Sequence, residues 1–358
     1  MTPLIRAIID ATALKSNLRR IRAVAPGSRV MAVVKANAYG HGLVPTALAL
    51  SEADAFAVAR LEEGIALREA GVSQTIILLE GVFSAEQLAE AAQRRFEIVV
   101  HDPLQIALLE RATGAHRFVI WVKVDTGMNR LGFRAQELAP VLARLRALAP
   151  APAELRVMTH LARADERDCP MTALQIERFD AVTATLGLVR SIGNSAGILG
   201  WPSARGEWVR PGLALYGISP FPGEASSAVG LIPAMTLAST VIAVRRVPRG
   251  ESVGYGGTWT APRESRIAIV AGGYGDGLPR SLKTGTPVLV NGRRAPLVGR
   301  VAMDMIAADV TELPEVEVGT RCVLWGRGLE VTEVAQCAGT IAYELLCGVR
   351  ARVPREPI

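Results

Sequence analysis

Lys35 is the residue whose position points most directly to chemistry. It ends the apolar run VMAVVK and precedes the segment ANAYGHG. Where parallel strands close into a barrel, functional side chains gather at the carboxyl ends of the strands. An amine held in a dry site there has a lowered pKa and attacks carbonyl groups. Lys35 is therefore a candidate attachment point for a carbonyl-bearing cofactor, although a lysine can also simply emerge at a strand end.

Tyr255 is a second candidate, because it lies between glycines in the string VGYGG. Glycine within strand-like sequence indicates the close approach of another backbone or of a ligand. A phenol has an unperturbed pKa near 10 and needs help to act as a base at neutral pH. The alternative is an ordinary packed aromatic side chain in a β domain.

The elements that must position Lys35 alternate between short apolar runs and amphipathic stretches from about residue 30 to residue 220. Expected strands cover residues 30–35, 55–58, 75–80, 97–100, 117–125 and 154–160, with two more near Val189 and Leu213. Expected helices cover residues 43–53, 61–71, 84–95 with Ser84 as N-cap, 102–112, 135–148 and 172–186. About seven or eight such β/α units predict an α/β fold, a closed (β/α)8 TIM barrel. An open doubly wound sheet is the alternative.

The sequence changes character after Pro222. β-Branched runs such as TLASTVIAVRRV and RCVLWG follow, separated by turn signals such as Asn291–Gly292, and helical periodicity returns only near 331–346. This pattern predicts a separate, mainly antiparallel β domain. We therefore expect two domains, residues 1–225 and 226–358.

Composition excludes several functional classes. The net charge of +6 comes from scattered arginines, and aromatic residues make up only 5% of the chain, so no nucleic-acid platform is expected. No apolar stretch approaches the roughly 18 residues of a membrane span, and no secretory leader is recognisable. A cytoplasmic protein without membrane partners follows. The four cysteines form no CxxC pair, which predicts free thiols and no metal site.

The string VVKANAYGHG at 33–42 closely resembles the cofactor-lysine motif of alanine racemases. Further blocks follow in that family's order: KVDTGMNRLGF (123–133), MTHLARADE (158–166), IGNSAG (192–197), WVRPGLALYG (208–217), VGYGGTW (253–259), GYGDGLPR (273–280), GRVAMDM (299–305) and IAYELLC (341–347). The resemblance implies a barrel followed by a β domain, the cofactor pyridoxal 5'-phosphate, and interconversion of L- and D-alanine. Gly275 and Ala302 depart from the residues usual in the family.

The resemblance assigns catalysis to two bases. Lys35 would hold the cofactor through its side-chain amine and act on one face of the substrate, and Tyr255 on the other. Arg210 would face the pyridine nitrogen, with His160 linking Arg210 to Tyr255. Arginine stays protonated in proteins, so the ring nitrogen would stay neutral.

The remaining implied roles concern binding and assembly. Arg130 would contact the cofactor phenolate and the substrate carboxylate, held by Lys123 in a carbamylated form (N6-carboxylysine). Further cofactor contacts, mostly to the phosphate, would come from Tyr39, Asn194, Ser195, Gly212, Leu213 and Tyr343. In a homodimer, Tyr255, Met303 as a substrate contact and Asp304 would come from the partner subunit. The access corridor would include Asp165, Arg280, Arg300 and Ile341.

Three other functions compete with this interpretation. A racemase of the same fold could act on serine or on several amino acids. A decarboxylase of basic amino acids would need an acidic partner for the ring nitrogen, and Arg210 argues against one. A cofactor carrier without catalysis would not need the domain that bears Tyr255. Supply of D-alanine for peptidoglycan and alanine catabolism both fit the sequence.

Overall fold

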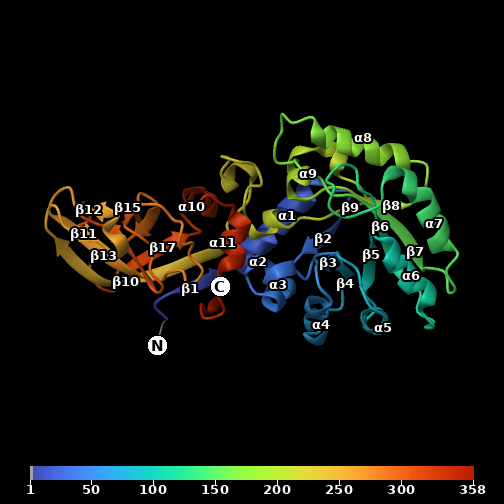
Figure 1. The fold of residues 1–358 in the computed structure, drawn as a ribbon, viewed down its shortest axis with the longest axis horizontal. Helices are drawn as coiled ribbons and strands as arrows, with labels where there is room; N and C mark the ends of the chain where they lie inside the picture. The colour runs from blue at the N-terminus through green and yellow to red at the C-terminus, as the bar shows by residue number, and fades with distance from the viewer. Residues whose placement is uncertain (1–2) are drawn as a thin grey trace.

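The computed structural model describes residues 3–358 and contains a closed barrel beside a second sheet (Figure 1). Parallel strands β2 to β9 pair in sequence order, and β9 pairs with β2. Their bounds are β2 Arg29–Val33, β3 Ala55–Val58, β4 Thr75–Leu78, β5 Glu97–Val100, β6 Val119–Lys123, β7 Glu154–Met158, β8 Val189–Ser191 and β9 Trp208–Val209. The predicted barrel is therefore confirmed, and the open sheet is excluded.

Helices cover the outside of the barrel (Figure 1). Their bounds are α1 Ala11–Val24, α3 Leu43–Ala49, α4 Leu61–Glu69, α5 Ala85–Gln93, α6 Pro103–Arg111, α7 Leu138–Arg146, α8 Met171–Thr183 and α9 Ser195–Gly200. The hydroxyl of Ser84 accepts the N–H of Gln87 at 3.2 Å, which confirms the predicted N-cap of α5.

The prediction of a strand near Leu213 is wrong. The last barrel strand is β9, and Leu213–Tyr216 forms a buried 3-10 helix, η3. Pro211 has no N–H to donate to a sheet, so the strand ends before it. The apolar run LALY is explained by burial alone, which does not distinguish a strand from a short helix.

The second sheet contains eight strands in the order β13-β16-β15-β14-β17-β10-β1-β18, and β13 also pairs with β10. Its bounds are β1 Arg6–Ile9, β10 Met235–Val247, β13 Ser265–Ala271, β14 Pro287–Val290, β15 Arg293–Val298, β16 Met305–Asp309, β17 Arg321–Trp325 and β18 Arg355–Pro357; a separate ribbon is formed by β11 Ser252–Val253 and β12 Trp259–Thr260, and the helices are α10 Val331–Ala338 and α11 Ala342–Gly348. Asn291 and Gly292, with φ of 50° and 75°, form the predicted hairpin turn between β14 and β15. The mainly antiparallel second domain is confirmed.

The first strand of the chain belongs to this second sheet, which the sequence did not suggest. β1 pairs antiparallel with β10 and parallel with β18. The chain therefore forms β1 of the second sheet first, then all eight barrel strands, and then the remaining strands of the second sheet. The domain division between residues 225 and 226 stays a prediction. β1 is an exception to it, because β1 precedes the barrel in sequence but pairs within the second sheet.

Within residues 3–358, no helix is both long enough and apolar enough to cross a membrane. The same part of the chain contains no group of three or more His, Cys, Asp or Glu side chains arranged to hold a metal. All four cysteines are free thiols, as predicted.

A buried ion pair fills the amino-terminal end of the barrel. Arg156 on β7 lies 3.2 Å from the Glu97 carboxylate on β5, and the indole of Trp121 on β6 donates to Glu97 at 2.7 Å. The guanidinium lies over the rings of Trp121 and Trp208, 5.1 and 5.7 Å from their centroids. Burial raises the pKa of Glu97, and Arg156 opposes that rise. The pair closes the barrel end opposite the strand carboxyl ends.

We expect Arg156→Met to destabilise the protein by about 3–5 kcal/mol at pH 7, because it leaves the Glu97 carboxylate buried without its cation. The loss should shrink as the pH falls, since a carboxyl whose pKa is raised on folding costs its full stability above the raised pKa and none below the unfolded-state pKa. Urea unfolding at several pH values measures both effects. Arg144→Met is the matched control, because Arg144 pairs with Glu110 at the exposed surface and should change little. An equal loss in both variants would contradict the assignment.

Candidate active site

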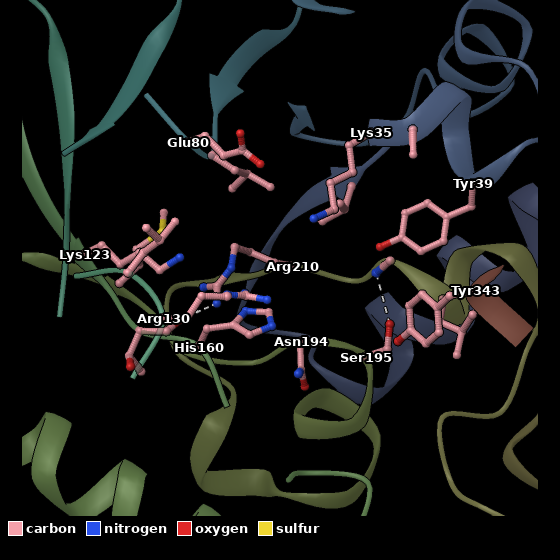
Figure 2. A pocket seen from close by; sticks show the side chains of 18 of the residues that line it. Lys35, Tyr39, Glu80, Lys123, Arg130, His160, Asn194, Ser195, Arg210 and Tyr343 are labelled. Carbon is pink, nitrogen blue, oxygen red and sulfur yellow. Dashed lines mark hydrogen bonds between the residues drawn. The ribbon is translucent and has the colours of Figure 1, made fainter. Parts of the chain in front are cut away.

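A cavity of about 460 Å³ opens at the carboxyl ends of the barrel strands. Its lining comes mainly from residues that end or directly follow β2, β4, β6, β7, β8 and β9. The predicted residues that line it are Lys35, Tyr39, Lys123, Arg130, His160, Asn194, Ser195, Arg210, Gly212, Leu213 and Tyr343. Figure 2 shows Lys35 pointing into the cavity from one side and Lys123 from the other. Residues spread over some 300 positions of sequence thus meet in one cavity because the barrel closes.

The backbone directly after Lys35 turns in the left-handed sense. Ala36, Asn37, Ala38 and Tyr39 have φ between 51° and 54°, and this turn is the segment labelled α2, Lys35–Tyr39. Left-handed helical geometry costs about 1–2 kcal/mol per residue with a side chain. Such strain persists only when the surrounding structure holds it, and it concentrates at functional sites. The turn sends Lys35 and Tyr39 to the same cavity.

Neighbouring elements hold this turn. His41 donates from Nδ1 toward the carbonyls of Ala38 and Tyr39, at 3.1 and 3.0 Å. Burial lowers the pKa of His41 to about 4, so its ring is neutral at physiological pH. At Gly40, a Cβ would lie 2.0 Å from the Leu346 carbonyl oxygen of α11. Glycine there lets the second domain pack directly on the turn.

Tyr39 is placed by aromatic packing. Its ring stacks on Tyr216 of η3 with centroids 4.6 Å apart, and the Tyr216 hydroxyl donates to the Val33 carbonyl at 2.9 Å. Burial raises the pKa of Tyr39, so its hydroxyl keeps its proton and can donate to an anion. A Cβ at Gly212 would lie 2.4 Å from that hydroxyl, so glycine is required for this approach.

Ser195 and the start of η3 form a cradle of donors. The Ser195 hydroxyl oxygen accepts from the backbone N–H groups of Gly212 and Ala214, at 3.0 and 3.1 Å. With its lone pairs occupied, the hydroxyl has its proton left to donate. Asn194 caps α9 by accepting the N–H of Gly197 at 2.9 Å. Helix starts leave backbone N–H groups without partners inside the helix, so this corner suits an anion.

Arg210 is buried on neutral partners. It donates to the Ser191 hydroxyl at 2.5 Å, to the Ile192 carbonyl at 3.1 Å and to the Thr159 carbonyl. Burial lowers the pKa of Arg210 to about 10, which leaves it protonated at neutral pH. Since its partners carry no negative charge, the guanidinium presents an uncompensated positive charge to the cavity.

The positive charge of the cavity lowers the pKa values of Lys123 and His160. Burial, together with the charges of Arg210 and Arg130, lowers the pKa of Lys123 to about 8. Burial and then Arg210 lower the pKa of His160 well below its usual range. Within residues 3–358 the His160 ring makes no hydrogen bond to Arg210, so the expected link through His160 stays a prediction.

Seven of the expected site residues lie outside this cavity in the single chain. They are Tyr255, Met303, Asp304, Asp165, Arg280, Arg300 and Ile341. Arg280 and Arg300 line a second, open hollow of about 400 Å³. Asp304 pairs with Arg352 at 2.7 Å. Asp165 lies close enough to Tyr343 to raise its pKa, after burial, to about 12.

The departures from the family pattern concern backbone packing near Met303. Gly275 donates its N–H to the Met303 carbonyl at 2.8 Å, and Tyr274 donates to the Ala302 carbonyl at 3.0 Å. A Cβ at Gly275 would lie 2.8 Å from Arg352 and 3.0 Å from the Met303 oxygen. Glycine at 275 therefore allows the two segments to lie closer than alanine would.

Sequence reasoning missed several residues of the site. Glu80 lines the cavity just after β4 (Figure 2), and the strand-end rule that found Lys35 could have found it. Cys347 of α11 also lines the cavity. Ser191 and the Thr159 carbonyl hold Arg210, which only the fold reveals, because their sequence strings carry no signal.

Comparison with known proteins agrees with this geometry. Family models described as alanine racemase, N-terminal domain, and alanine racemase, C-terminal domain, match residues 9–220 and 234–357. Among curated relatives, the alanine racemase of Nitrosococcus oceani is 51% identical over 350 residues, covering 98% of each chain. That of Shewanella amazonensis is 48% identical over 359 residues, covering 99% of each chain.

Solved structures extend the likeness to the whole fold. The biosynthetic alanine racemase of Pseudomonas aeruginosa is 45% identical, with a TM-score of 0.97 and full coverage of both chains. The alanine racemase of Acinetobacter baumannii is 40% identical, with a TM-score of 0.94 and full coverage of both chains. The fold, the match of both family models and the relatives at about half identity agree: this chain belongs to the alanine racemase family of enzymes.

Proposed function

We propose that this enzyme interconverts L- and D-alanine with pyridoxal 5'-phosphate attached to Lys35. The observation that carries the proposal is the charge of the cavity. Four cationic side chains line it, Lys35, Lys123, Arg130 and Arg210, and among the described residues Glu80 supplies the one carboxylate in the lining. A confined excess of positive charge calls for an anionic occupant.

The residues present fit that cofactor. The phosphate would take the cradle of Ser195, Gly212 and Leu213, with the Tyr39 and Tyr343 hydroxyls as further donors. Gly212 supports this role, because any side chain there would displace the Tyr39 hydroxyl. Lys35 projects into the same cavity from the turn that also holds Tyr39 (Figure 2).

Two bases would move the proton at the substrate Cα. When bound, the cofactor draws electrons from the Cα–H bond of the amino acid. The Lys35 amine would remove or return the proton on one face, and the Tyr255 hydroxyl would do so on the other. One base would take the proton from its face while the other, already protonated, would give its proton to the opposite face, so one passage through the site would invert the configuration.

Arg210 would restrain the electron-withdrawing power of the cofactor. Its guanidinium keeps its proton and has only neutral partners, so it offers the ring nitrogen a positive charge and no acid. This supports racemisation over transamination. It also disfavours a decarboxylase of basic amino acids, for which an acidic partner is expected.

Lys123 would be carbamylated. An amine must be unprotonated to react with carbon dioxide, and the pKa of Lys123 is already lowered to about 8. The carbamate would convert a like-charge contact with Arg130 into an ion pair. Arg130 would then be held toward the substrate carboxylate, for which a guanidinium is well suited.

A second copy of the chain would complete each site. Tyr255 is 67% exposed and Met303 53% exposed, and neither lines the cavity of its own chain. Two neighbours of Met303, Tyr274 and Met305, are exposed as well. Exposed apolar clusters mark interfaces. We propose a homodimer in which Tyr255, Met303 and Asp304 reach the partner's cavity, with Asp165, Arg280, Arg300 and Ile341 along the corridor.

The cellular setting follows from the same proposal. Four free cysteines support a reducing compartment, and we propose the cytoplasm. Supply of D-alanine for peptidoglycan is favoured by the biosynthetic relative from Pseudomonas aeruginosa, with alanine catabolism as the alternative role.

Purified protein should convert either enantiomer of alanine to the racemate, as measured by chiral chromatography. Serine and basic amino acids, tested in parallel, should react far more slowly. Lys35→Ala should lose nearly all of the activity, because it removes both the attachment point and one base. Faster turnover of serine, or carbon dioxide release from lysine or arginine, would contradict the proposed substrate.

Tyr255→Phe should lose racemisation by at least about 1000-fold, since it deletes the only proposed base for one face. It should still bind the cofactor at Lys35. Exchange of the Cα proton with deuterated water should then persist for one enantiomer and nearly vanish for the other, as measured by NMR. Equal loss for both enantiomers would argue against separate facial roles.

Mixing the two inactive variants tests the shared site. In a heterodimer of Lys35→Ala and Tyr255→Phe, one site carries both defects and the other carries neither. Random exchange makes about half of the dimers mixed, so about a quarter of wild-type activity should return. Mass labelling confirms the exchange. Full exchange without recovered activity would mean that each site is built from one chain.

A further inference from the structure

Glu63 makes contacts that reach beyond its own helix. It is the third residue of α4, which follows β3 directly. Its Oε2 accepts the backbone N–H groups of Ala59 and Arg60, at 2.9 and 3.2 Å. These two bonds cap the start of α4, as a glutamate at this position commonly does.

The second carboxylate oxygen of Glu63 serves a different segment. Its Oε1 accepts the backbone N–H of Ala36 at 2.6 Å. Ala36 directly follows Lys35 and is the first left-handed residue of the turn. One carboxylate therefore ties the ends of two neighbouring barrel strands, β2 and β3, through three charge-assisted bonds, which are stronger than neutral ones.

We propose that Glu63 is a positioning residue for Lys35. It holds the strained peptide on the carboxyl side of the lysine, and so aims the Lys35 amine into the cavity. The inference rests on the proposed function, since it concerns the amine that would attach the cofactor. Helix capping alone would require one carboxylate oxygen, whereas the observed contacts use both.

The variants Glu63→Gln and Glu63→Ala test whether the bond to Ala36 has a role separate from the cap of α4. Glutamine keeps the size of the side chain but has one accepting oxygen, and its NH2 group would face an N–H donor. The variant must therefore lose either the Ala36 bond or the cap of α4. Glu63→Ala loses both.

Two controls separate the alternatives. Glu62→Gln removes the same charge from the same turn of α4, and Glu62 is exposed. Glu137→Ala removes a capping carboxylate elsewhere, because Glu137 accepts the Arg134 N–H at 2.6 Å. Within the part of the chain that the structure describes, neither control residue forms a hydrogen bond or an ion pair with the Lys35 turn.

The first readout is hydrogen exchange in cofactor-free protein, followed on a peptide that spans residues 33–42 and so retains the Ala36 amide. Loss of the Ala36 bond to a charged group should speed exchange there by about 10- to 100-fold in Glu63→Ala, which loses that bond in any case. The controls should match wild type in this peptide. Thermal melting checks that all four variants fold.

The second readout is capture of pyridoxal phosphate, followed by the visible band that forms on addition to cofactor-free protein. Glu63→Ala should bind it about 10- to 100-fold more weakly than the controls. In Glu63→Ala, exchange or capture equal to that of the controls would overturn the proposal. If wild type itself captures no cofactor, the proposed function fails, and the exchange comparison alone decides the role of Glu63.

Discussion

Positive charge confined at the carboxyl end of the barrel is the constraint on which the site depends. Lys123 shows its strength, because burial and neighbouring guanidinium groups lower its pKa to about 8. Arg210 keeps its proton and is held by neutral oxygens, so none of its hydrogen-bond partners neutralises its positive charge. An anionic cofactor, a substrate carboxylate and a carbamate on Lys123 would each neutralise part of it. The chemistry we propose therefore follows from an electrostatic need that the fold creates.

Backbone geometry decides where the Lys35 amine points. The left-handed turn from Ala36 to Tyr39 is costly, and it is held by Glu63 from β3–α4, by His41 from within and by α11 from the second domain. The second sheet thus takes part in shaping the barrel mouth of its own chain. Because β1 and the end of the chain lie in that sheet, the barrel is tied to it at both termini.

The sequence predicts those parts of this arrangement that depend on local patterns. Strand and helix periodicity yields the barrel, and the strand-end rule finds Lys35. The same patterns mislead at Leu213, where burial resembles a strand, and they are silent on β1, whose partners lie over 200 residues away. Glu63 resembles an ordinary helix cap in sequence. Its bond to Ala36 is visible only once β2 and β3 are adjacent, and the partner site that we propose for Tyr255 would lie outside any single chain.

The most direct test of the account is to locate the lysine that holds the cofactor. The chain has four lysines, at 15, 35, 123 and 283, so borohydride reduction of the protein loaded with pyridoxal phosphate, followed by peptide mass analysis, gives an unambiguous answer. Lys123 is a real competitor, since its lowered pKa makes its amine nucleophilic near neutral pH. We predict the reduced adduct on Lys35 alone, because only its turn also places Tyr39 at the phosphate cradle. An adduct on Lys123, or one spread over several lysines, would contradict the account.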